Sequence, residues 1–296
     1  MEFAMGDRVI VEVDGSAAGL DAVDLAAREA QLRRVSLHLV HALGRSSAHL
    51  RPDVSPWSRT HYGSESLVHG ALARAEERAH VTAPDIEVTR AVVVAHARDA
   101  MEIESRRAAL AVVGDQDLSR LAGLLGSTAV HLAAHGHCPL LMVRGRPRPV
   151  GPVLLAVDGS RAGEASVGFA FAEAALRQAP LVALHVWNSW SEGAYEGPSD
   201  PLTAVVTDVD HVREAEQHML RDTVAPWQEV FPQAAVERRL VRARIRPTLI
   251  DASRHAQLVV AGARGRGGFT GSLLGSVSQA LLRHADCPVA VVRGKE

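Results

Sequence analysis

The sequence predicts an α/β protein built from two doubly wound parallel-sheet domains in tandem. The first observation is an internal repeat: Asp14-Gly-Ser returns 144 residues later at Asp158, and Gly126-Ser returns 149 residues later at Gly275. The second is that five short apolar runs alternate with helical stretches in each half. Such alternation indicates a mostly parallel sheet that helices cover on both faces.

The boundary between the two halves is a short segment rich in proline and glycine, residues 145–152. This composition is unsuited to a helix or a central strand, so we interpret the segment as a semi-rigid linker. We therefore expect one domain at 1–145 and a second at 152–296.

Each half opens with an apolar run that predicts the first strand, at Val9–Val13 and at Val153–Val157. Asp-Gly-Ser follows each run, and apolar residues then recur at helical spacing. Ser16 is placed to be the N-cap of the helix in the first half, and the same arrangement follows Asp158 in the second.

The later apolar runs also match in pairs and predict further strands. The pairs are Leu37–His41 with Leu181–Val186, Leu110–Val113 with Leu258–Ala261, and Leu140–Arg144 with Val289–Arg293. The last pair is expected to supply edge strands, whose unpaired backbone groups favour association. Segments 45–65 and 188–206 lack periodicity and are expected to be mobile loops that lead into the second helix of each half.

The charge balance narrows the class of partner. A net charge of −2 and a pI near 6.7 argue against a nucleic-acid-binding protein that needs a basic face. No apolar run reaches the length of a transmembrane helix, and Met1–Arg8 lacks the apolar core of a signal peptide. We expect a cytoplasmic protein that has neither nucleic acid nor membrane as a partner.

Several catalytic classes are excluded by what the sequence lacks. Lys295 is the only lysine, so neither domain can supply a Walker-type phosphate lysine or a Schiff-base lysine. The chain contains no G-x-S-x-G elbow, no H-E-x-x-H motif and no G-x-G-x-x-G after a first strand. The sequence therefore predicts no catalytic residue.

Histidines and cysteines are interpreted as structural residues. His131 and His135 are four residues apart on an expected helix, but no acidic motif accompanies them. His135 recurs as His284, which favours a role in capping helix ends. Cys138 and Cys287 each precede a proline and an apolar run, which is typical of small buried residues. No metal site made of protein ligands is predicted.

A glycine loop in the second half has the spacing G-x2-G-x9-G-S, through Gly262, Gly265, Gly275 and Ser276. The apolar run Leu258–Ala261 precedes it, and a helical pattern begins near Ser276. Glycine lets backbone N–H groups approach an anion, and a helix N-terminus adds unpaired donors and a favourable dipole. The loop therefore predicts a phosphate cradle.

An acidic residue is expected to face this cradle. Ligands of open α/β sheets bind beyond the carboxyl ends of the strands, where the strand order reverses. The first strand of the second half ends at Asp158 and the fourth at Gly262. A carboxylate repels phosphate but accepts hydrogen bonds from a ribose hydroxyl or an adenine amine. Together the two features predict a nucleotide site.

On these motifs the chain resembles a tandem universal stress protein, with two UspA-like domains of the ATP-binding type, over essentially its whole length. The resemblance implies an adenine nucleotide alpha hydrolase-like fold with strand order 3-2-1-4-5 in each domain. It also implies ATP with Mg²⁺, bound as a signal by a stress-response sensor or regulator. The ATP contacts that it implies are Ala156, Asp158, Val186, Gly262, Gly265, Arg266, Gly275, Ser276, Val277 and Ser278.

The sequence leaves two interpretations for the two arginines of the glycine loop. Arg264 and Arg266 either add positive charge beside the phosphates or point to water.

The first half departs from the family pattern. Asp117 stands where the second glycine belongs, and the spacer that follows has eight residues instead of nine. A carboxylate ~4 Å from a phosphate oxygen costs on the order of 4 kcal/mol at an effective dielectric of 20. We also interpret His41 as replacing the small apolar residue of the adenine site. This half is predicted to bind ATP weakly or not at all, through Asp14, Gly114, Gly126, Ser127 and Thr128.

Other functions remain open on the sequence alone. One is a slow ATPase or another enzyme that processes adenosine phosphates, and another is a purely structural tandem domain. The resemblance implies that the fifth strands join the two halves, and we expect the chains to form homodimers through edge strands. The sequence does not identify a protein partner or a stress.

Overall fold

The computed structural model describes residues 6–43, 59–114, 126–145, 150–188, 209–266 and 274–294, with side chains from residue 68 onward in the second range. These residues form two compact units. Unit 1 comprises Met1–Arg144 and Pro288–Arg293, and unit 2 comprises Gly145–Cys287 and Gly294–Glu296. Asp117 with its spacer, and most of the predicted loops at 45–65 and 188–206, lie outside the described residues.

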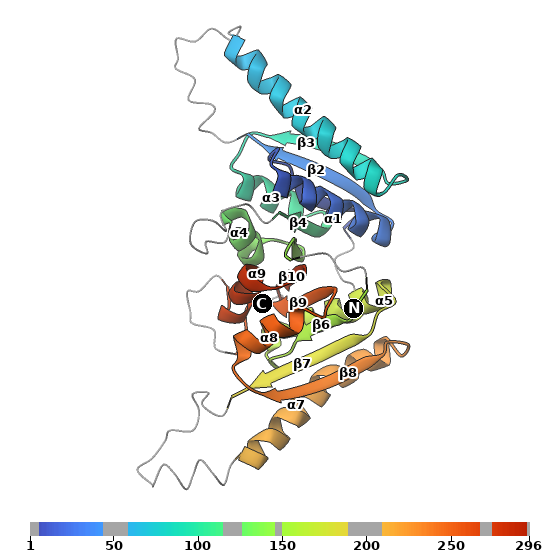
Figure 1. Ribbon diagram of the computed structural model, residues 1–296, viewed down its shortest axis with the longest axis vertical. Coiled ribbons are helices and arrows are strands. Elements are labelled where there is room, and N and C mark those ends of the chain that lie inside the picture. The colour runs from blue at the N-terminus through green and yellow to red at the C-terminus, as the bar shows by residue number, and fades with distance from the viewer. Residues whose placement is uncertain are drawn as a thin grey trace, which may run out of the picture. The chain divides into compact units, whose positions relative to one another are not determined.

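Unit 1 contains a parallel sheet with one antiparallel addition (Figure 1). Its strands are β1 (Arg8–Glu12), β2 (Ser36–Ala42), β3 (Val88–Val93), β4 (Ala108–Val113), β5 (Leu140–Met142) and β10 (Val289–Val292). The first five are parallel in the order β3-β2-β1-β4-β5, which confirms the predicted order 3-2-1-4-5 for the first half. β10 pairs antiparallel with β5, so the two predicted fifth strands do meet.

Unit 2 repeats this plan. Its strands are β6 (Val153–Ala156), β7 (Leu181–Trp187), β8 (Val236–Arg242) and β9 (Leu258–Gly262). They are parallel and lie in the order β9-β6-β7-β8, which is the order of β4, β1, β2 and β3 in unit 1. The α/β class with tandem parallel sheets is therefore confirmed.

Helices cover both faces of each sheet. Unit 1 has α1 (Ala17–Arg33), α2 (Arg59–Thr82), α3 (Ala97–Ser105) and α4 (Ser127–His135), and unit 2 has the 3-10 turn η3 (Arg161–Gly163), α5 (Glu164–Leu176), α7 (Val209–Val230), α8 (Ile245–Ser253) and α9 (Ser276–His284). α1 packs on α2 and α3 packs on α4, while α1 and α3 both contact β1 and β4. The pairs α5–α7 and α8–α9 repeat this arrangement in unit 2.

Burial follows from this layering. Every residue of β7 is buried, and only the two end residues of β1 are partly exposed. The outer strands β3 and β8 carry exposed residues among partly buried ones. Strands covered on both faces are mostly apolar, as the continuous runs of the sequence predicted, although β7 also carries the buried His185.

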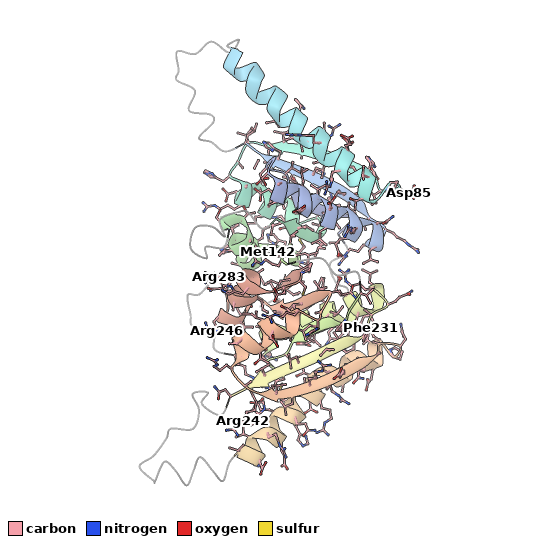
Figure 2. The ribbon with its side chains drawn as sticks, in the orientation of Figure 1. Asp85, Met142, Phe231, Arg242, Arg246 and Arg283 are labelled. Carbon is pink, nitrogen blue, oxygen red and sulfur yellow. The ribbon has the colours of Figure 1, made fainter. Side chains whose placement is uncertain are left out.

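Aromatic residues fill the space between α5 and α7. The ring of Phe171 is fully buried, 6.4 Å from that of Trp227 and 5.9 Å from that of Phe231. Figure 2 labels Phe231, which directly follows α7. Offset ring contacts of this kind add to the stabilisation from burial.

The predicted N-caps are present in both units. The Ser16 Oγ accepts a hydrogen bond of 2.9 Å from the backbone N–H of Gly19 and so caps α1. In unit 2 the Ser160 Oγ accepts one of 3.1 Å from Gly163, but there the helix begins with the turn η3 before α5. The prediction of the two N-caps is therefore confirmed, whereas the sequence did not predict the turn η3.

Removing the first cap is expected to destabilise unit 1 modestly. Ser16→Ala leaves the N–H of Gly19 without its side-chain acceptor, and such losses typically amount to about 1 kcal/mol. Urea unfolding monitored by circular dichroism measures the change. Ser16→Asp keeps an acceptor and should stay close to the wild type; equal losses in both variants would contradict the capping role.

Candidate functional site

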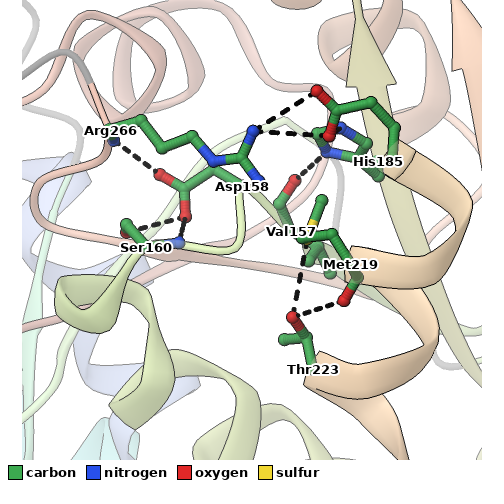
Figure 3. A network of polar contacts seen from close by, with 8 residues as sticks. Val157, Asp158, Ser160, His185, Met219, Thr223 and Arg266 are labelled. Atoms are coloured by element: carbon green, nitrogen blue, oxygen red, sulfur yellow. Dashed lines mark hydrogen bonds and ion pairs between the residues drawn. The ribbon is translucent and has the colours of Figure 1, made fainter. Parts of the chain in front are cut away.

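We use the name crevice of unit 2 for the region beyond the carboxyl ends of β6 and β9, which are neighbouring parallel strands. Asp158 follows β6 by two residues and touches both sides of this crevice (Figure 3). Its Oδ1 accepts hydrogen bonds from the N–H and the hydroxyl of Ser160, at 2.9 and 2.8 Å. Its Oδ2 accepts one of 3.1 Å from the backbone N–H of Arg266, in the loop after β9.

Gly265 lies against this carboxylate. A Cβ at this position would be 2.3 Å from the Asp158 Oδ2, far inside van der Waals contact. Any side chain here must therefore displace the carboxylate or the loop. This close approach is a physical reason for the second glycine of the motif.

The two ends of the glycine loop are tied together. The N–H of Gly275 donates to the carbonyl oxygen of Ala263 at 2.8 Å. The buried hydroxyl of Ser278 donates to the carbonyl oxygen of Gly262, the last residue of β9, at 2.6 Å. The Ser278 hydroxyl thus anchors α9 to the strand.

The N-terminus of α9 begins at the exposed Ser276 and is followed by the partly exposed Val277. Its N-cap residue is Gly275, and no side chain caps it. The first N–H groups of a helix have no acceptor within the helix. This end of α9 is consequently suited to an anion.

The Arg266 side chain is 47% exposed, and its guanidinium contacts an acidic residue of α7 (Figure 3). Its Nη1 lies 3.4 and 3.3 Å from the two carboxylate oxygens of Glu216. Glu216 in turn lies 3.0 Å from the Nε2 of the buried His185 on β7. Sequence reasoning missed both partners. Arg264 is exposed.

The two residues that the resemblance assigns to the adenine end are small or apolar. Ala156 is the last residue of β6 and is partly exposed. Val186 is buried in β7, opposite Val241 of β8. Neither brings charge to the crevice, which suits the flat face of an aromatic base.

Gly159 shapes the turn between Asp158 and Ser160. Its φ is +69°, a conformation that favours glycine, and a Cβ there would lie 2.4 Å from the Met219 sulfur and 2.6 Å from the Arg266 Nη2. The Asp-Gly-Ser motif is thus a backbone requirement as well as a source of polar groups.

The equivalent crevice of unit 1 holds an additional carboxylate. Glu12 ends β1, at the position that Ala156 occupies in unit 2, and shares a cavity with Asp14. Its side chain hydrogen-bonds to Thr128. Burial, together with the charge of Asp14, raises the pKa of Glu12 although this hydrogen bond opposes the change. Sequence reasoning missed Glu12, although the repeat aligns Val-Glu-Val-Asp with Leu-Ala-Val-Asp.

Four of the five candidate residues of unit 1, all except Ser127, line the same cavity. Asp14 accepts hydrogen bonds from the N–H and hydroxyl of Ser16 at 2.9 and 2.6 Å, as Asp158 does from Ser160. Gly126 is the N-cap of α4 without a side-chain cap, and the exposed Ser127 begins the helix. The cavity is lined by Glu12, Asp14, Gly19, Val113, Gly114, Gly126, Thr128 and Ala129.

One expectation for unit 1 was wrong. His41 does not replace the residue aligned with Val186, because its counterpart is His185. Both histidines place Nδ1 against the carbonyl oxygen of the residue that follows β1 or β6, at 2.6 and 2.7 Å. The residue aligned with Val186 is Ala42, which is itself small and apolar. The adenine end of unit 1 therefore gives no reason for weak binding.

The pKa shift of Glu12 predicts a pH-dependent stability. A carboxyl whose folded pKa lies above its ordinary value favours the fold most when it is protonated, and this contribution is lost as the pH rises through the raised pKa. Glu12→Gln should therefore raise the melting temperature at pH 7. The difference in melting temperature between this variant and the wild type should become smaller as the pH falls through that pKa. Thermal unfolding at several pH values measures it. Glu77→Gln, on an exposed position of α2, is the control; a gap independent of pH would contradict the prediction.

The histidines of α4 have an acidic neighbour that the sequence did not reveal. The His131 Nε2 lies 2.6 Å from Glu102 of α3, and its ring is 4.8 Å from that of His135, the last residue of α4. Within the described ranges, no three or more His, Cys, Asp or Glu side chains are grouped so that they could hold a metal ion.

The cysteines form no disulfide. Cys287 is fully buried, and Cys138 is partly buried. Burial raises the pKa of the Cys138 thiol to about 12. This thiol is therefore a poor nucleophile at neutral pH.

No helix within the described part of the chain combines the length and apolar character needed to cross a membrane.

Comparisons with known proteins agree along the whole chain. The model of the Universal stress protein family matches residues 5–144 and 150–293. A universal stress protein of Mycobacterium tuberculosis is 38% identical over 96% of each chain, and one of Mycolicibacterium smegmatis is 35% identical over 96% of each. The crystal structure of a universal stress protein from Archaeoglobus fulgidus matches with a TM-score of 0.68 and 14% identity, over 98% of this chain and 100% of that one.

Proposed function

The chain belongs to the universal stress protein family, and we propose that its unit 2 binds ATP as a regulatory ligand of the stress response. The observation that carries the proposal is the contact between the Asp158 carboxylate and the loop after β9, beside the uncapped N-terminus of α9. We assign residues 152–296 to the nucleotide-binding domain and residues 1–145 to a domain whose nucleotide loop departs from the family pattern.

The two ends of the crevice suit the two ends of the nucleotide. The Asp158 carboxylate already accepts three hydrogen bonds, and a carboxylate offers about four acceptor positions, so it can take one more from a ribose hydroxyl. Ala156 and Val186 offer apolar surface to the base. The phosphates would lie on the loop and on the start of α9, at Gly262, Gly265, Gly275, Ser276, Val277 and Ser278, with Arg266 beside them.

The residues present fit Mg²⁺ only as a companion of the phosphates. Mg²⁺ usually keeps several waters and binds substrate phosphates with one or two carboxylates. The carboxylates of the crevice, Asp158 and Glu216, already receive hydrogen bonds from the protein. When bound, Mg²⁺ would reduce the charge of the phosphates, while the backbone N–H groups of the loop and α9 orient them.

We propose binding without ordinary turnover, as a signal that changes shape or partners. The test is to purify the protein without added nucleotide and identify the released nucleotide by mass spectrometry. Bound ATP that stays intact for hours at 25 °C supports a sensor. Turnover above about 1 per second, an ordinary enzyme rate, would instead establish the alternative of an adenosine phosphate-processing enzyme.

We also propose that the protein works in the cytoplasm as a homodimer, with a protein rather than nucleic acid or a membrane as its downstream partner. β3 in unit 1 and β8 in unit 2 are outer strands of their sheets, and each offers an edge for chain association. Val92 on β3 is 43% exposed, which suits such a contact. A single-chain mass in sedimentation at micromolar concentration would contradict the dimer.

A further inference from the structure

We propose that Glu12 is the residue that makes unit 1 reject polyphosphate nucleotides, because its carboxylate takes the place that a phosphate would occupy at the start of α4. The inference rests on the proposed function of unit 2, since it assigns to Glu12 a part of the difference in nucleotide affinity between the two crevices. Glu12 ends β1 and hydrogen-bonds to Thr128, the second residue of α4. The carboxylate therefore lies at the helix end that binds anions.

The cavity around Glu12 is acidic and small. Its volume is about 20 Å³, roughly the room for one water molecule. Two carboxylates, Glu12 and Asp14, line it, and no Arg, Lys or His side chain of the described residues does. A polyphosphate that entered would meet the negative charges of both carboxylates.

The crevice of unit 2 differs at the two positions that matter. Ala156 replaces Glu12 at the end of the first strand, and Val277 replaces Thr128 at the second position of the helix. Both helices otherwise start alike, after a glycine N-cap without a side-chain cap. Unit 2 therefore keeps its helix end open where unit 1 fills it with a carboxylate of its own.

The test moves the charge between the two units of the full-length protein, with ATP as the probe in isothermal titration calorimetry. In unit 2, Ala156→Glu is compared with Ala156→Gln, which has nearly the same size and no charge. In unit 1, Glu12→Gln is examined in a chain that also carries Gly265→Asp, so that unit 2 contributes no binding. Glu77→Gln in the same background controls for net charge. Uncharged adenosine is titrated in parallel.

The proposal expects Ala156→Glu to weaken ATP binding at least about tenfold more than Ala156→Gln does, because an added carboxylate near phosphate opposes binding strongly. It also expects Glu12→Gln to raise the affinity of unit 1 for ATP at least about tenfold, with adenosine changing less than about threefold and Glu77→Gln having no effect.

Equal losses from Ala156→Glu and Ala156→Gln would overturn the proposal, and so would an unchanged affinity of unit 1 in Glu12→Gln. Failure of the proposed function gives a different result, since the wild type would then bind no ATP in unit 2. In that case the Glu12→Gln arm alone decides: a gain of ATP binding supports the role of Glu12, and no gain contradicts it.

Discussion

Gly265→Asp should abolish ATP binding by unit 2. A Cβ at this position would lie 2.3 Å from the Asp158 Oδ2, so the substitution forces the loop and the carboxylate apart. It also brings a negative charge to the phosphates, at a cost on the order of 4 kcal/mol, or several hundred-fold in affinity. Because a ligand that binds only the native state stabilises it, ATP should raise the melting temperature of the wild type but not of the variant.

Two further variants give this prediction its controls. Gly265→Ala adds only the Cβ, so it separates the steric effect from the charge. At Gly70, on an exposed position of α2, a Cβ would meet no atom within 4 Å, so Gly70→Ala should leave ATP binding unchanged. If Gly265→Asp binds ATP within about threefold of the wild type, the assigned loop does not hold the phosphates.

Arg177→Leu should destabilise unit 2 by about 3–5 kcal/mol. Arg177 lies 2.9 Å from Glu173 of α5, and the two side chains are 15% and 3% exposed. Removing the guanidinium takes a positive charge away from the buried Glu173 carboxylate, and removing one partner is the costly way to break such a pair. Guanidinium chloride unfolding, followed by tryptophan fluorescence to which the buried Trp187 and Trp227 of unit 2 contribute, measures the loss.

A double variant and a surface pair complete this experiment. Glu173→Leu combined with Arg177→Leu removes both charges and should recover much of the lost stability. Arg239 and Glu237 form an ion pair on β8 with side chains 53% and 55% exposed, so Arg239→Leu should cost less than about 1 kcal/mol. A loss in Arg177→Leu no larger than in Arg239→Leu would contradict the importance of burial.

Features encoded locally could be predicted from the sequence. The continuous apolar runs predicted β1 and β6 and their burial, since parallel strands covered on both faces need no polar alternation. Asp-Gly-Ser predicted the N-caps at Ser16 and Ser160 because the cap needs only a hydroxyl within three residues of its donor. The strand order came from the family resemblance.

Contacts between distant segments could not be predicted. Glu216 lies on α7 and contacts His185 and Arg266 only because α7 packs beside β7. No sequence motif predicts these contacts. Glu102 meets His131 for the same reason, through the packing of α3 on α4. The error at His41 was a shift of one residue along a strand, which moves a side chain to the opposite face of the sheet.

Nucleotide binding by unit 2 is tested by the stoichiometry of ATP bound to the full-length protein in the presence of Mg²⁺. Calorimetric titration of the wild type and of Gly265→Asp, each first stripped of nucleotide, provides it. We expect one ATP per chain in the wild type and none in the variant. A wild type that binds no ATP, or a variant that still binds as the wild type does, would contradict it.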